Sequence, residues 1–314
     1  MQFISLRQVV VPAFILLFSL LISCKDEISN EPVRSQRDSS VLLLKGSESE
    51  LSLIRLMTDE YKKKNPGISF KIDGGGSGVG IDALIKDEID IANSSRMITE
   101  REIRMARDIH LNPLQVIIAI DAVSIITHSK VGIDSLSVEQ LAGLFSGKIK
   151  NWKEVGGVDL PVVVVSRNEN SGTHHYLLSR LGIDAYATGA KIEPGYAEIV
   201  KEVSEQIGAI GYVNLGSIFN TNGMPCKAVW VANIYVEGMR ASSPYNFDDI
   251  RNGDYPLIRP LYQYINEPVR GGITNFIRFE LSDTIQAQLE QHGYFPITQI
   301  YKTINMKNGF SPGK

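Results

Sequence analysis

Short apolar runs that alternate with segments of helical periodicity constrain the fold of this chain most strongly. Residues 41–44 and 68–72 have the pattern of strands, and Leu51, Ile54 and Tyr61 fall on one face of the helix expected between them. This order of elements is typical of α/β units with mostly parallel sheets. The sequence therefore predicts an α/β fold.

Two apolar stretches have the features of passages between two lobes. Residues 117–126, interrupted by Asp121, are long for one strand, as expected where a strand leaves one lobe and enters another. A second passage is required on the way back, and residues 228–236 are the candidate. The expected first lobe comprises residues 41–121 and 232–314, and the expected second lobe comprises residues 122–231.

The N-terminus has the pattern of a targeting segment. Residues 1–23 read as a lipoprotein signal peptide, because a positive charge precedes an apolar run over 9–21 that is short for a membrane span. The run leads into the phrase LISC, which resembles a bacterial lipobox and makes Cys24 the expected site of lipidation. Residues 24–40 are polar and predict a flexible tether. The alternative is a buried N-terminal helix with a chance cysteine.

Composition excludes several classes of partner and cofactor. The chain has 314 residues and a formal net charge of -3, which gives no electrostatic footprint for nucleic acid. Its five histidines lack the spacing of metal ligands, so no metal site is expected. The glycine-rich segment 74–80 lacks the Lys-Ser/Thr of a P-loop and the acidic residue expected after a dinucleotide fingerprint. We therefore expect no ATP, NAD or other cofactor.

Three expected strand-to-helix junctions are built from Gly and Ser, at residues 46–49, 74–80 and 170–173. Helix N-termini expose unpaired N–H groups and the positive end of the helix dipole, so such junctions suit an anion. Any one of these junctions could be an ordinary cap or turn. Three of them in one chain, distributed over both expected lobes, favour a binding site. The candidate anion-binding residues are Ser47, Glu48, Ser49, Ser77, Gly78, Ser94, Ser95, Arg96, Arg167, Ser171, Gly172 and Thr173.

Two arginines follow expected buried strands. Arg167 lies just after the strand predicted at 161–165 and four residues before Ser171, where its guanidinium fork can reach an oxyanion. Glu169 is close enough in sequence to hold that fork, and the alternative is a surface Arg–Glu pair. Arg96 poses the same choice between a ligand contact and a solvated charge.

A hydrolase is the enzymatic alternative, because His174 and His175 lie close to Ser171. Adjacent residues on a helix point about 100° apart, so the two histidines cannot face one site. No G-x-S-x-G elbow surrounds the serine. We therefore expect a protein without catalytic residues, with a phosphoester hydrolase as the alternative.

The chain resembles the phosphate-binding proteins of bacterial phosphate ABC importers from about Leu44 to beyond Pro296. The phrases that carry the resemblance are residues 46–49, 72–80, 90–96, 145–152, 167–173, 208–213 and 255–262. The resemblance implies a type II periplasmic-binding-protein fold, two-lobed with two hinge strands, that binds inorganic phosphate between the lobes. It further implies an extracytoplasmic, lipid-anchored monomer, at the periplasmic face or the cell surface, that delivers phosphate to permease subunits. A surface lipoprotein that senses anions without a permease is the remaining alternative.

The resemblance also implies roles for individual residues. By position, the first-loop donors are Ser47 and Ser49, the glycine-loop donor is Ser77, and the second-lobe group is Arg167 with Ser171, Gly172 and Thr173. Ser95 stands where many family members have an aspartate that accepts the phosphate proton. Glu48 stands where threonine is common, and we expect it to accept that proton and so to exclude sulfate. The alternative for Glu48 is a solvated carboxylate beside a helix N-terminus.

Overall fold

The computed structural model describes residues 40–218 and 229–313. The predicted signal peptide, the lipidation site Cys24 and all of the tether except Ser40 lie outside the described residues. In the part of the chain that is described, no helix has the length and apolar character needed to cross a membrane.

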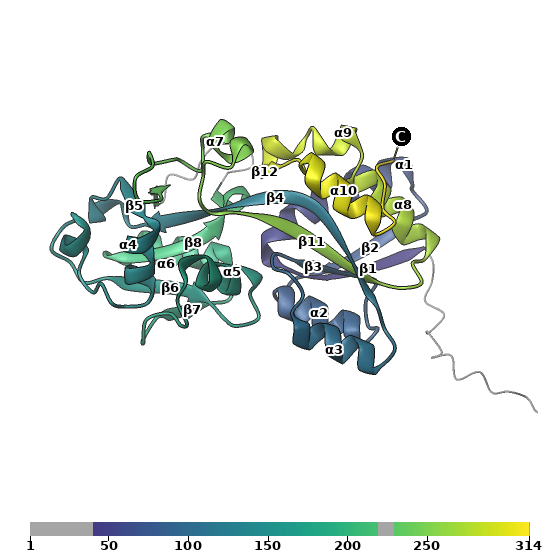
Figure 1. Cartoon of the computed structure of the whole chain (residues 1–314), viewed down its shortest axis with the longest axis horizontal. Coiled ribbons are helices and arrows are strands. Elements are labelled where there is room, and N and C mark those ends of the chain that lie inside the picture. Colours follow the sequence, from purple (N-terminus) through teal and green to yellow (C-terminus); the bar gives the residue numbers. More distant parts are fainter. Residues whose placement is uncertain (1–39, 219–228, 314) are drawn as a thin grey trace, which may run out of the picture. The chain divides into compact units, whose positions relative to one another are not determined.

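Strands and helices alternate through most of the described chain (Figure 1). The strands are β1 (Val41–Gly46), β2 (Ser69–Asp73), β3 (Ile91–Ser94), β4 (Pro113–Thr127), β5 (Ser135–Ser137), β6 (Val163–Arg167), β7 (Lys191–Glu193), β8 (Ala209–Asn214), β9 (Trp230–Val231), β10 (Asn233–Tyr235), β11 (Ile258–Asn266) and β12 (Tyr294–Phe295). The helices are α1 (Leu51–Lys64), α2 (Ser77–Ile85), α3 (Glu100–Asp108), α4 (Val138–Phe145), α5 (Gly172–Leu181), α6 (Tyr196–Glu205), α7 (Phe247–Asn252), α8 (Gly271–Glu280), α9 (Asp283–Gln286) and α10 (Gln299–Lys307).

The main sheet has the strand order β2-β1-β3-β11-β4-β8-β6-β7. Its flanks are parallel, because β1 pairs in parallel with β2 and β3, and β6 pairs in parallel with β7 and β8. Its centre is antiparallel: β11 runs opposite to both β3 and β4, and β4 runs opposite to β8. The prediction of mostly parallel sheets is therefore correct for the flanks and wrong for the centre, where β11 carries the chain back along β4.

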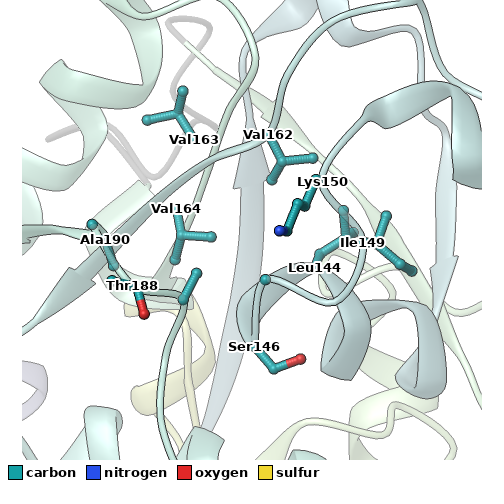
Figure 2. A pocket seen from close by; sticks show the side chains of 12 residues that line it. Leu144, Ser146, Ile149, Lys150, Val162, Val163, Val164, Thr188 and Ala190 are labelled. Carbon is teal, nitrogen blue, oxygen red and sulfur yellow. The ribbon is translucent and has the colours of Figure 1, made fainter.

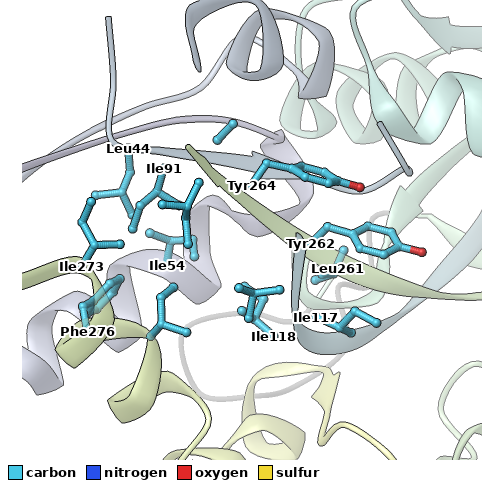
Figure 3. Packing of buried hydrophobic residues seen from close by; sticks show 14 of the residues in the cluster. Leu44, Ile54, Ile91, Ile117, Ile118, Leu261, Tyr262, Tyr264, Ile273 and Phe276 are labelled. Carbon is cyan, nitrogen blue, oxygen red and sulfur yellow. The ribbon is translucent and has the colours of Figure 1, made fainter. Parts of the chain in front are cut away.

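Two clusters of buried apolar side chains form the core. The first gathers side chains from β1, β3, α1, α2 and α8, and Figure 3 shows Leu44, Ile54 and Ile91 from it close to Ile273 and Phe276. The second gathers side chains from α4, β6, α5, α6 and β8. Strand β4 contributes to both clusters, as expected for the passage at residues 117–126.

The return passage lies later in the chain than expected. Residues 232–257, assigned from the sequence to the first lobe, contribute Ala232, Ile250 and Leu257 to the second cluster. Segment 229–236 forms only the short strands β9 and β10, whereas β11 has nine residues and pairs along β4. The expected passage at 228–236 is therefore wrong, and β11 takes its place.

Local sequence signals explain how the helices begin. The phrase Thr99-Glu100-Arg101-Glu102 has the sequence spacing of a capping box, and the structure confirms it. The Thr99 side chain accepts from the Glu102 N–H, and the Glu102 side chain accepts from the Thr99 N–H. Helix α2 begins at Ser77, within the glycine-rich segment 74–80. The N-cap Gly76 has a φ of +103°, a backbone conformation that glycine adopts without steric cost.

Candidate anion-binding site

Arg167, the last residue of β6, is the central charge of the site. Its exposed fraction is 1%, and its guanidinium lies over the ring of Tyr196, with 5.3 Å from Cζ to the ring centroid. Its Nε and Nη1 atoms have no hydrogen-bond partner among the described residues. A buried cation with unused donors is costly, and a bound oxyanion would remove that cost.

Glu169 does not hold the Arg167 fork as the sequence suggested. It is exposed, and its backbone oxygen lies 2.6 Å from Nε2 of His175. The described residues contain no ion pair of Arg167. Because Arg167 is buried, the alternative of a surface Arg–Glu pair is also wrong.

Three hydroxyl groups lie together beside Arg167. Ser49 Oγ is 3.0 Å from Thr173 Oγ1 and 2.6 Å from the Tyr196 hydroxyl, and the Thr173 and Tyr196 oxygens also form a hydrogen bond. All three residues are buried. Ser49 follows β1, whereas Thr173 is in the first turn of α5 and Tyr196 begins α6. We call Ser49, Thr173 and Tyr196 the hydroxyl triad.

Two further serines meet at Gly172. The Ser95 N–H donates to Ser77 Oγ at 3.0 Å, and the two hydroxyl oxygens are 3.4 Å apart. A Cβ atom at Gly172 would overlap both hydroxyls, so glycine is required for this close approach. Ser77, Ser95 and Gly172, predicted from two separate junctions and a strand end, therefore lie side by side.

The remaining junction serines are Ser171 and Ser47. Ser171 is the N-cap of α5, and its Oγ accepts from the His174 N–H at 3.3 Å. Ser47 is buried, and its N–H donates to the Asn93 carbonyl at 2.9 Å. Both residues thus belong to the loops that form the site, with Ser171 Oγ already engaged.

Three candidates are bonded within the protein. Arg96 donates to both carboxylate oxygens of Glu102, at 2.7 and 2.8 Å, so its two terminal nitrogens are engaged, whereas its Nε has no partner among the described residues. Ser94 Oγ donates to the Arg96 carbonyl at 2.6 Å. The Gly78 N–H donates to the Asn170 carbonyl at 3.0 Å, which occupies one amide of the α2 N-terminus. The structure gives these three residues partners other than a ligand.

Glu48 also differs from its expected placement. Its Oε1 accepts a hydrogen bond of 2.7 Å from the Gly75 N–H at an exposed position. A Cβ atom at Gly74 would overlap the same carboxylate, which places Glu48 against the glycine loop. The carboxylate is thus bound to this loop and has no hydrogen bond to the hydroxyl triad.

Sequence reasoning missed a buried ion pair beneath the triad. Arg259 on β11 lies opposite Asp121 on β4, and its Nε and Nη2 donate to Asp121 Oδ2 at 3.0 and 2.8 Å. Arg259 Nη2 also donates to Ser49 Oγ at 2.9 Å. Burial raises the pKa of Asp121 to about 6, although the nearby Arg259 opposes this shift. The available signals were Asp121 within an apolar run and Arg259 within the phrase 255–262.

Two pockets help to delimit the site. One of about 370 Å³ borders it and includes Ser95 and Arg259 in its lining. Another of about 440 Å³, shown in Figure 2, is lined mainly by Val162, Val163 and neighbouring apolar side chains, with Lys150 as its one charged residue. None of the candidate anion-binding residues lines this second pocket.

The histidines near Ser171 are not arranged for nucleophilic catalysis. His174 Nδ1 lies 2.8 Å from the Arg167 carbonyl, and burial lowers the pKa of His174. Ser171 Oγ contacts the His174 backbone rather than its ring. Within residues 40–218 and 229–313, no group of three or more His, Cys, Asp and Glu side chains could hold a metal ion.

Comparison with known proteins places the chain in a family. The family model described as "PBP superfamily domain" matches residues 32–284. The chain belongs to the PBP superfamily. The superfamily assignment confirms the predicted α/β periplasmic-binding-protein fold.

Individual relatives within the superfamily carry phosphate-binding names. "Phosphate-binding protein PstS" of Bacillus subtilis is 24% identical over 89% of this chain and 88% of its own length. The protein of the same name in Pseudomonas aeruginosa is 28% identical over 80% and 81%. A crystal structure from Clostridium perfringens, described as "a Putative Phosphate ABC Transporter Substrate-Binding Protein with Bound Phosphate", is 26% identical with a TM-score of 0.72. That alignment covers 82% of this chain and 100% of the solved chain.

Proposed function

We propose that this protein is the extracytoplasmic substrate-binding component of a phosphate ABC importer. The observation that carries the proposal is the buried guanidinium of Arg167, which has unused donors and packs on the ring of Tyr196, a member of the hydroxyl triad. Relatives that align over most of this chain are named for phosphate binding, and a similar solved structure holds phosphate. The resemblance found in the sequence leads to the same function.

Phosphate would lie between Arg167 and the first turn of α5. The guanidinium fork presents paired donors to two oxygens, and the Gly172 and Thr173 amides lie at the positive end of the helix. The hydroxyls of Ser49, Ser77 and Ser95 complete the set of donors around these groups. Ser47 lies in the same first loop and is the remaining donor carried over from the family.

The interactions are sufficient for reversible capture. Micromolar affinity requires about 8 kcal/mol, and hydrogen bonds to charged groups contribute about 1.5 to 3 kcal/mol each. Several such bonds, together with compensation of the buried Arg167 charge, reach this value. No bond of the ligand is broken, so the protein binds and releases phosphate and is not an enzyme.

The proposal includes the cell envelope as the site of action. The lipobox-like phrase ending at Cys24 supports a lipid anchor at the periplasmic face or cell surface, and ABC permease subunits are the proposed partners of a monomeric chain. Copurification with a permease distinguishes the two candidate functions, because an import component should associate with a permease and a permease-independent anion sensor should not. A protein that binds phosphate but never associates with a permease would favour sensing.

Calorimetry with inorganic phosphate tests the proposed function. Replacing Arg167 by Ala should weaken binding by at least about 2 kcal/mol, because the anion loses a buried charge-assisted partner. Arg104→Ala removes an equal charge from the exposed surface of α3 and should leave the affinity unchanged. Equal phosphate affinity in the wild-type and Arg167→Ala proteins would refute the assignment.

A further inference from the structure

Tyr196 joins three features of the site, although no sequence motif pointed to it. Its ring lies beneath the Arg167 guanidinium, and its hydroxyl bonds to both Ser49 and Thr173. Ser49 in turn accepts from Arg259. Tyr196 therefore both packs against the anion-attracting charge and supplies one of the polar atoms beside it.

The carboxylates near these groups lie in different surroundings. Asp121 accepts two hydrogen bonds from Arg259 at Oδ2, whereas its Oδ1 is buried without a hydrogen-bond partner among the described residues. Glu48 accepts one hydrogen bond from the glycine loop. Glu169 is exposed. Glu50 is fully buried, and this burial raises its pKa well above the usual range. Among the described residues, no carboxylate forms a hydrogen bond with the hydroxyl triad.

Hydroxyls and carboxylates discriminate differently between oxyanions. An ionised carboxylate only accepts hydrogen bonds, so it favours phosphate, which carries a proton near pH 7, and repels sulfate, which carries none. A hydroxyl donates one hydrogen bond and accepts others, and it rotates to suit its partner. In each pair of the hydroxyl triad either oxygen can be the donor.

We propose that the hydroxyl triad, with Tyr196 as a ligand-contacting residue, makes this site accept tetrahedral oxyanions with or without a proton, sulfate as well as phosphate. The inference rests on the proposed function of the same site. It replaces the expected role of Glu48 as the proton acceptor, because Glu48 is bound to the Gly75 amide.

Parallel titrations of the purified protein with inorganic phosphate and with sulfate at pH 7 test the inference. We expect sulfate to bind within about tenfold of the phosphate affinity and to displace phosphate. Phosphate binding with sulfate more than about tenfold weaker overturns the inference and leaves the proposed function intact. Failure to bind either anion overturns the proposed function and the inference with it.

Variants of the hydroxyl triad test which hydroxyl groups contribute to the binding of phosphate and sulfate. Tyr196→Phe keeps the ring under Arg167 but removes the hydroxyl, and should weaken both anions by about three- to tenfold. Thr173→Val removes a second hydroxyl of the triad at similar volume and should also weaken the binding of both anions. This variant provides the test if the Tyr196→Phe protein fails to fold. Tyr186→Phe is the matched control, since its hydroxyl bonds to the His174 carbonyl outside the triad. Unchanged affinity for both anions in folded Tyr196→Phe protein would overturn the role of the triad.

Discussion

Breaking the buried Asp121–Arg259 pair should cost more stability than replacing both partners. The two residues lie opposite each other on β4 and β11, with exposed fractions of 0% and 2%, and are joined by two hydrogen bonds to one carboxylate oxygen. Removing one partner of such a pair typically costs about 3–5 kcal/mol, because the other charge is left buried and uncompensated. Replacing both by uncharged side chains of similar volume is often close to neutral.

A double-mutant cycle measures this coupling. We expect Asp121→Asn and Arg259→Met each to lower the free energy of unfolding by about 3 kcal/mol, and the double variant to lose no more than one single variant. In thermal unfolding, each single variant should melt about 6–12 °C lower. The assay is urea unfolding without phosphate at pH 8, where Asp121, with a pKa raised to about 6, is ionised. Additive losses in the double variant would refute a coupled pair.

Three further changes follow from the same structure. Gly172→Ala should weaken phosphate binding at least about tenfold, because its Cβ would overlap two serine hydroxyls. The control Gly271→Ala, with no atom within 4 Å of its Cβ, should bind phosphate as tightly as the wild-type protein. Equal phosphate affinities of the two variants would contradict the close approach at Gly172. Burial raises the pKa of Glu280 well above its usual range, so the folded state keeps a proton that the unfolded state releases above about pH 4.3. The free energy of unfolding should therefore fall between pH 5 and pH 8, and Glu280→Gln should reduce that fall in urea titrations, whereas an identical slope would exclude this linkage. Cys24→Ala should release the protein from the membrane fraction, and mass spectrometry showing an unmodified Cys24 or an intact 1–23 segment would disprove lipidation.

Local signals predicted the parts of the fold that depend on neighbouring residues. The capping box at Thr99 and Glu102 needs only two suitable residues three positions apart, and the structure contains it. The buried face of α1 includes Ile54 and Tyr61, as its periodicity indicated. Arg167 ends a buried strand for the same reason, since an apolar run followed by a Gly/Ser junction marks a strand end.

Long-range pairing could not be predicted from the same signals. Arg259 meets Asp121 across 138 positions, and Ser49 meets Tyr196 across 147. These contacts depend on the register of β11 against β4 and on the packing of α6, which no local period specifies. The polar residues within β11 also hid its role, because they made this passage between the two clusters hard to recognise as a buried strand.

Charge partners were the other source of error. The sequence placed Glu169 beside Arg167 and left Arg96 without a partner, because proximity in the chain was the only guide. In the structure Glu102 takes the Arg96 fork, and Glu169 is exposed. Side-chain direction, set by the backbone at each position, decides such pairs.

A crystal structure of the protein grown with inorganic phosphate tests the central claim most directly. The account predicts a tetrahedral anion within hydrogen-bonding distance of the Arg167 guanidinium and of the Gly172 and Thr173 amides, beside the hydroxyl triad. Phosphate bound elsewhere, with Arg167 still unpartnered, would contradict it.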